Sequence, residues 1–214
     1  MDIVPRTQKD WEQLVNTTTA GAGTLVDLLC TVPICQFLLG LASEHRINDQ
    51  LDELRTMSED QKKEISTKIS KDYINSREFM IFYSNALEEF KKIKNIEKIQ
   101  YFRSAVINGM IRRDVEENKK LLFIDALSNL PFDAVFLLKQ IHDIGLGREE
   151  GRHNFVEIMK ITGRDEFLLA AELKALERYH LLDIDRPSGG SNRTFDLIIY
   201  GKFGKEFISF ITNY

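Results

Sequence analysis

The 214 residues of this chain suffice for one large domain or two small ones, and a hydrophobic content of 43% can build a core. The formal net charge of −4 and a pI near 5.7 give no overall positive field, which argues against non-specific nucleic-acid binding. Cys30 and Cys35 have neither zinc-knuckle nor redox C-x-x-C spacing, so we interpret them as buried thiols of a cytoplasmic protein.

The first segment, residues 1–45, is organised around an apolar stretch at residues 20–42. The opening letters, MDIVPRTQKDWEQ, carry mixed charge and predict no secretory signal. The apolar stretch approaches the ~20 residues of a membrane span, but Asp27, Pro33 and Gln36 interrupt it. Three interpretations stay open: a buried core segment, which we favour, a surface-lying or oligomer-forming segment, and a true membrane span.

Residues 46–129 are predicted to form a charged α-helical region. Capping-box spacing at residues 58–61 predicts a polar helix that continues to about Asp72. The next stretch, REFMIFYSNALEEFKKI, predicts a helix that is buried on most of its surface. Its apolar residues at helical spacing are Phe79, Phe82, Ala86 and Phe90.

Asn95 can cap a further helix, whose apolar residues define one face. This face consists of Ile96, Ile99, Phe102, Val106 and Met110. We expect Lys98 and Arg103 to point away from it, and we interpret the lysines of residues 91–98 as a solvated surface rather than a nucleic-acid site. Another helix, at about residues 114–128, is expected to contribute Leu121, Leu122 and Ala126 before Pro131.

Residues 130–214 follow the element order of a winged-helix domain: three helices, a β-hairpin and a last helix. The first helix starts at Pro131 and is expected to turn Phe132, Val135, Phe136, Leu138 and Ile141 towards the core. A loop over residues 142–154 leads to the short helix FVEIMKIT, which Gly163 ends. We therefore predict a mainly α fold, with a helical N-terminal region and a C-terminal winged-helix domain.

The third helix of this domain begins near Arg164 and is expected to pack through four apolar residues. These residues are Phe167, Ala171, Leu173 and Leu176. The stretch LLDIDRPSGGSNRTFDLIIY then predicts a hairpin with a polar turn. Gly201-Lys202-Phe203-Gly204-Lys205 lacks P-loop spacing, and we interpret it as the turn into the last helix, with Gly204 allowing close packing.

The charges of the third helix argue against DNA reading. Helix-turn-helix modules place this helix in the major groove, where phosphates demand Lys and Arg. Residues 164–178 hold four acidic against three basic side chains, and residues 130–214 hold thirteen against eleven. Weak contact remains open through the candidate interaction residues, which are Arg164, Lys174, Arg186, Arg193, Lys202 and Lys205. We favour a protein-contact role for the domain.

The sequence offers little for catalysis. No Walker loop, G-x-S-x-G elbow or H-E-x-x-H motif occurs. Arg148 and His153 have the R-x4-H spacing of HEPN ribonucleases, but they fall in a glycine-broken stretch that favours two solvated loop side chains. His142 and His180 are expected at helix ends, where capping roles are ordinary. We predict no enzyme, no catalytic residues, no cofactor and no metal site.

Three short motifs carry a family resemblance. LPFDAVFLLKQI has a Leu-Pro-apolar-Asp helix start, HNFVEIM follows, and GKFGKEFISFI has the ending Gly-x-x-Phe-x-x-Phe-Ile. Over residues 120–214 the chain thereby resembles bacterial proteins of the abortive-infection alpha (Abi-alpha) group. The resemblance implies a bacterial cytoplasmic protein linked to anti-phage defence, and it carries over no catalytic residues.

We therefore expect a non-enzymatic protein-interaction component of an anti-phage defence system, with a protein partner or self-association through residues 20–42. The alternatives are a winged-helix DNA-binding regulator and a membrane-perturbing effector. We expect no strong nucleic-acid binding. We expect a cytoplasmic location, and the alternative that stays open is peripheral membrane contact through residues 20–42.

Overall fold

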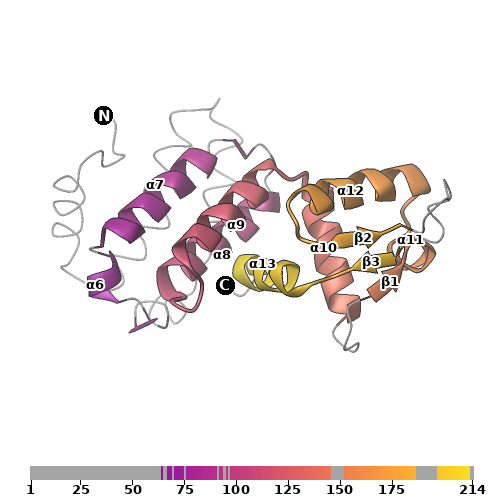
Figure 1. Cartoon of the computed structure of the whole chain (residues 1–214). Coiled ribbons are helices and arrows are strands. Elements are labelled where there is room, and N and C mark those ends of the chain that lie inside the picture. Colours follow the sequence, from indigo (N-terminus) through magenta and orange to yellow (C-terminus); the bar gives the residue numbers. More distant parts are fainter. Residues whose placement is uncertain are drawn as a thin grey trace, which may run out of the picture. The chain divides into compact units, whose positions relative to one another are not determined.

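The computed structural model describes residues 64, 67–68, 70–74, 76–90, 92–93, 95, 97–145, 152–186 and 197–212. Within them the chain is mainly helical, with short antiparallel strands in its C-terminal part (Figure 1). The chain divides into two compact units, residues 1–128 with 213–214 and residues 129–212. The predictions for residues 20–42 and 58–61 lie outside the described residues. Among the helices that are described, none has the length and apolar character needed to cross a membrane.

The first unit contains four described helices, which are α6 (Lys71–Ile74), α7 (Arg77–Phe90), α8 (Glu97–Ile111) and α9 (Glu117–Asn129). Figure 1 shows α7 and α8 side by side. The four apolar residues predicted to bury α7 are all buried. The predicted cap of α8 is also confirmed, because Asn95 Oδ1 accepts hydrogen bonds from the backbone N–H groups of Glu97 and Lys98 at 2.7 and 3.3 Å.

A glycine sets the close approach of α7 and α8. A Cβ at Gly109 would lie 2.0 Å from Cζ of the Phe82 ring. The Phe82 ring is itself buried, so α8 accepts it only where a residue has no side chain.

Lys98 corrects one prediction for α8. Its side chain is 4% exposed instead of pointing away from the apolar face, and Nζ donates to the carbonyl oxygen of Ser128 at 2.9 Å. Burial lowers the pKa of Lys98 to about 8, because the charged form loses its hydration. Lys98 therefore does not belong to the solvated surface that we expected over residues 91–98.

Lys120 is a second buried lysine, on α9, and it joins three helices. Its side chain is 0% exposed, and Nζ donates to the Tyr73 hydroxyl of α6 at 2.8 Å and to the Gly109 carbonyl of α8 at 3.1 Å. A third bond reaches Glu117 Oε1 at 2.7 Å, within α9. By contrast, Leu122, which we expected to pack, is 57% exposed. Ala126 is buried as predicted, so the prediction for α9 is confirmed at Ala126 and wrong at Leu122.

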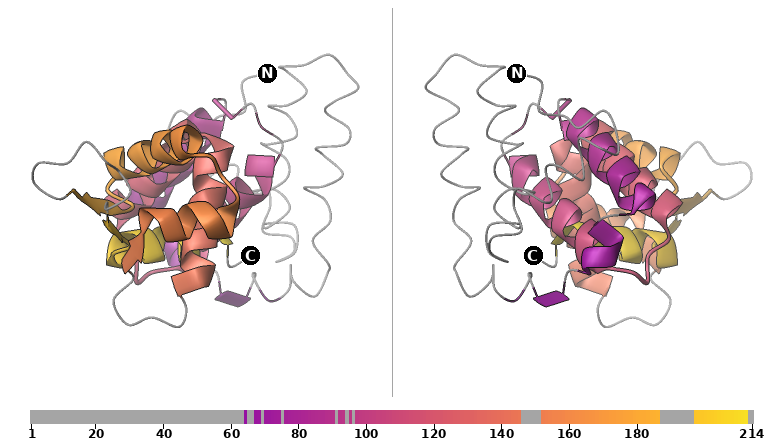
Figure 2. Two further views of the ribbon diagram at one scale, coloured as in Figure 1. Left: turned by 90° about the vertical axis from the view of Figure 1, so that its right-hand side faces the viewer. Right: turned by 90° about the vertical axis from the view of Figure 1, so that its left-hand side faces the viewer.

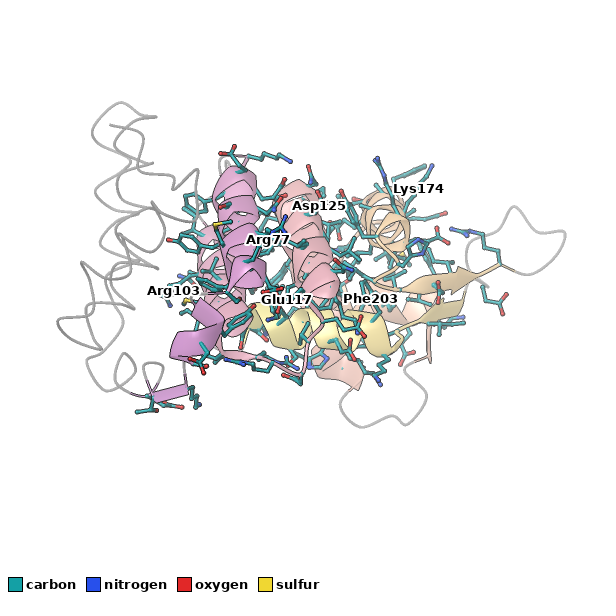
Figure 3. The ribbon with its side chains drawn as sticks, turned by 60° about the vertical axis from the view of Figure 1, so that its left-hand side comes forward. Arg77, Arg103, Glu117, Asp125, Lys174 and Phe203 are labelled. Atoms are coloured by element: carbon teal, nitrogen blue, oxygen red, sulfur yellow. The ribbon has the colours of Figure 1, made fainter. Side chains whose placement is uncertain are left out.

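Tyr73 and Glu117 complete this polar cluster. The Tyr73 hydroxyl lies 2.8 and 2.9 Å from the two carboxylate oxygens of Glu117, which is labelled in Figure 3. Burial, the hydrogen bond to Glu117 and its negative charge raise the pKa of Tyr73, whereas burial lowers the pKa of Lys120. Because each polar group has a partner, the cluster fixes α6 against α8 and α9.

The second unit contains four helices and three short strands among its described residues. In chain order these are α10 (Phe132–Gly145), β1 (Arg152–Asn154), α11 (Phe155–Thr162), α12 (Glu166–Arg178), β2 (Asp183–Asp185), β3 (Leu197–Ile199) and α13 (Lys202–Thr212). The strands form an antiparallel sheet of order β1-β3-β2, in which Ile198 lies opposite both His153 and Ile184. The predicted loop over residues 142–154 is wrong at both ends, since α10 continues to Gly145 and β1 occupies residues 152–154.

α10 lies at the centre of this unit and contacts α11, α12 and α13. The left view of Figure 2 faces the unit and shows α12 beside α10. Val135, Leu138 and Ile141 of α10 are buried as predicted, whereas Phe136 is exposed. On α12 the buried residues are Leu169, Glu172, Leu173 and Leu176. The predictions that Phe167 and Ala171 pack inward are wrong.

Two glycines define the ends and contacts of helices in this unit. Gly163 ends α11 as predicted, with φ of 68° and its N–H bonded to the Met159 carbonyl. Gly204, in the first turn of α13, is buried, and a Cβ there would lie 2.1 Å from the Leu181 carbonyl oxygen. The expectation that Gly204 allows close packing is therefore confirmed.

Candidate interaction surface

The two helices α11 and α12 each begin at a side-chain cap. Asn154 Oδ1 accepts a hydrogen bond from the Val156 N–H at 2.9 Å, at the start of α11. Asp165 Oδ1 accepts from the N–H groups of Phe167 and Leu168, both at 2.9 Å, at the start of α12. The Asp165 carboxylate thus occupies the N-terminal end of α12 and gives that end a negative charge.

Four exposed residues form one stripe along α12: Phe167, Ala171, Lys174 and Arg178. Their spacing of four, three and four residues places them on the same side of an α-helix. Phe167 is 82% exposed, which is far beyond the exposure of the other exposed apolar side chains among the described residues. Figure 3 shows Lys174 on the side of α12 that faces away from the strands. We call these four residues the outward stripe.

The beginning of the outward stripe has apolar surroundings. Leu168 is exposed beside Phe167, and Ile161 is exposed in the last turn of α11, just before the turn that leads into α12. Large apolar side chains that are exposed close together commonly mark contact sites. The outward stripe is therefore apolar at its start and cationic at its end.

Arg164 is largely covered rather than presented on this surface. Its side chain is 10% exposed, Nε donates to Glu172 Oε2 at 2.6 Å, and Nη1 donates to Gln140 Oε1 at 2.6 Å. Nη2 also lies 3.4 Å from the Asp133 carbonyl oxygen, and the guanidinium lies 6.0 Å from the centre of the Phe136 ring. Arg164 therefore ties the start of α12 to α10.

Glu172 is the acidic partner of this buried pair. Its Oε1 atom has no hydrogen-bond partner in the described part of the chain. Burial raises the pKa of Glu172, and the charge and hydrogen bond of Arg164 oppose that rise. We expected Arg164 to be a surface cation, but it forms an ion pair with Glu172 instead.

Arg186 is the second candidate cation with an acidic partner. Its Nη1 and Nη2 atoms donate to the two carboxylate oxygens of Glu177 on α12, each at 2.8 Å. The hydrogen bond from Arg186 lowers the pKa of Glu177. A guanidinium held in this bidentate pair has fewer donors left for a phosphate group.

The remaining candidates lie elsewhere. Lys202 is exposed at the start of α13, with Nζ 3.7 Å from Glu206 Oε1. Lys205 is exposed, and its Nζ lies 5.9 Å from the centre of the Tyr200 ring. Arg193 lies outside the described residues. Of the six candidates, Lys174 belongs to the outward stripe. Its neighbours on the stripe were not candidates, because we expected Phe167 to pack inward and did not name Arg178 as a contact residue.

The histidines of this unit are placed as follows. His142 Nδ1 lies 3.0 Å from the Tyr200 hydroxyl, with the rings edge to face. Burial is the main reason why the pKa of Tyr200 is raised. His153 belongs to strand β1 rather than to the loop that we expected, while Arg148 lies outside the described residues. His142 thus has a packing role between α10 and the residue that follows β3.

Comparison with known proteins adds no identification. No family model, no curated protein and no solved structure matches the chain.

Proposed function

We propose that residues 129–212 form a winged-helix module that binds protein, not DNA, through the outward stripe of α12. Two features support this assignment of the fold. The elements follow in the order helix, strand, helix, helix, strand, strand, and in the sheet β3 lies between β1 and β2. In such a module α12 is the third helix, which DNA-binding members insert into the major groove. The function of the module therefore depends on which side chains α12 exposes to a binding partner.

The observation that carries the proposal is the exposure of Phe167 in the first turn of α12. Recognition helices contact base edges mainly through their N-terminal residues. Here that end presents an exposed aromatic ring directly after two acidic residues, Asp165 and Glu166, and the Asp165 carboxylate caps the helix. A carboxylate next to a phosphate repels it, whereas an exposed aromatic side chain is a typical anchor of protein interfaces.

The cellular role that we propose follows from the motifs of residues 120–214. Their resemblance to the Abi-alpha group supports a non-enzymatic interaction component of a bacterial anti-phage (abortive infection) system. In that role the module would hold another polypeptide, and its cations would serve stability or contact rather than catalysis.

A DNA-binding regulator is the second candidate, because Lys174 and Arg178 are both exposed on the outward stripe. Fluorescence anisotropy of labelled duplex DNA, titrated with the full chain at physiological salt, separates the two functions. We expect no binding tighter than about 10 µM, since non-specific affinities lie near 10⁻⁴–10⁻⁶ M and the start of α12 is acidic.

A dissociation constant below about 1 µM that weakens steeply with added salt would overturn the protein-contact proposal. The double charge reversal K174E/R178E serves as the control, because both side chains are exposed on α12. If residual binding is unaffected by this change, the DNA contact does not involve the outward stripe.

A further inference from the structure

We propose that the partner of the outward stripe is a second copy of this chain, with the two α12 helices packed antiparallel. This inference rests on the proposed function, because it takes the outward stripe to be a protein-contact surface. The stripe is aromatic in its first turn and cationic in its last turns, with Ala171 between them.

The stripe is complementary to itself when one helix is reversed. About a two-fold axis between residues 172 and 173, Phe167 of each copy faces Arg178 of the other, and Ala171 faces Lys174. A guanidinium on an aromatic face is favourable, and the small Ala171 side chain lets the helices approach. A two-fold interface of this kind uses the same surface on both copies.

Charge complementarity selects the antiparallel orientation. The start of α12 carries Asp165 and Glu166, and its end carries Lys174 and Arg178. Reversal places the acidic start of one helix beside the basic end of the other and opposes the helix dipoles. A parallel pair would instead place Arg178 beside Arg178.

The size of the outward stripe limits the expected affinity of the dimer. α12 has 13 residues, which correspond to about 20 Å of helix. Leu168 adds exposed apolar surface at its start, yet a pair of such short helices buries less area than tight, permanent interfaces do. We therefore expect a reversible dimer with a dissociation constant of about 1–100 µM.

The test is sedimentation equilibrium of the full chain, up to about 200 µM, with the variants F167R and R178E. F167R places two arginines face to face at each contact, and R178E replaces the cation opposite Phe167, so each variant should weaken self-association at least about tenfold. In an equimolar mixture, the arginine introduced by F167R meets the glutamate introduced by R178E at one contact, and the native pair forms at the other. We expect the mixture to form heterodimers at least about fivefold tighter than either variant pairs with itself.

The mixture also controls for folding, because two misfolded variants would not restore one another. Leu122→Arg, at an exposed apolar residue of α9, should leave self-association unchanged. A monomeric wild-type chain, a dimer indifferent to F167R, or a mixture without rescue would each overturn the antiparallel dimer. Such results leave the protein-contact function intact, whereas sub-micromolar DNA affinity would overturn that function independently.

Discussion

Replacement of Gly204 by alanine is expected to destabilise the second unit by on the order of 3 kcal/mol or more. The new Cβ would lie 2.1 Å from the Leu181 carbonyl oxygen and 2.7 Å from the Tyr200 ring. Neither group can yield cheaply, since one is backbone and the other is a buried ring close to His142. Without these contacts, alanine in a helix would be favoured by about 1 kcal/mol. The close packing at Gly204 therefore makes a glycine-to-alanine substitution destabilising, although such a substitution usually stabilises a helix.

Urea denaturation followed by circular dichroism measures this effect, with Gly201→Ala as the matched control. Gly201 has nothing within 4 Å of its added Cβ, so we expect G201A to change the unfolding free energy by less than about 1 kcal/mol. Equal midpoints for G204A and G201A would contradict the close approach of α13 to the Leu181 backbone.

Replacement of Lys120 by alanine is expected to cost the first unit about 3 kcal/mol. The change removes three hydrogen bonds from Nζ and leaves a void where a fully buried side chain stood. The Glu117 carboxylate, which is half-buried, would also lose its cation. Because Tyr73 anchors α6 to this cluster, we expect the backbone amides of α6 to lose protection first.

Thermal unfolding together with amide hydrogen exchange measures this loss. Lys92→Ala is the control, because Lys92 is exposed and forms an i,i+3 ion pair with Glu89 at 2.6 Å. Such surface pairs contribute at most about 1 kcal/mol. If K120A were no more destabilising than K92A, the account of Lys120 as a buried link between α6, α8 and α9 would be wrong.

Local signals allowed much of the helical structure to be predicted from the sequence. The caps at Asn95 and Gly163 depend on one or two neighbouring residues, and both have the expected geometry. The burial of α7 could be predicted because aromatic residues occur on most sides of the helix, so that any packed side buries some of them. The strand β1 was missed because the letters RHN show no apolar alternation, and pairing with β3 defines it through the backbone.

Buried charges explain why the candidate surface was predicted less well. Glu172 lies on the buried side of α12, where Arg164 pairs with it, and Phe167 lies outside that side. The predictions for Leu173 and Leu176 are confirmed, whereas those for Phe167 and Ala171 are wrong. Lys98 was predicted wrongly for a similar reason, since the carbonyl group that accepts its hydrogen bond belongs to Ser128, far away in sequence.

The most direct measurement for the central claim is photo-crosslinking in cells from a photoreactive phenylalanine analogue at position 167, with position 122 as the matched exposed site. The protein-contact function predicts adducts from position 167 that resist nuclease and are destroyed by protease. It also predicts that the same adducts are absent from position 122. Nuclease-sensitive adducts at position 167, or identical adducts at both positions, would contradict it.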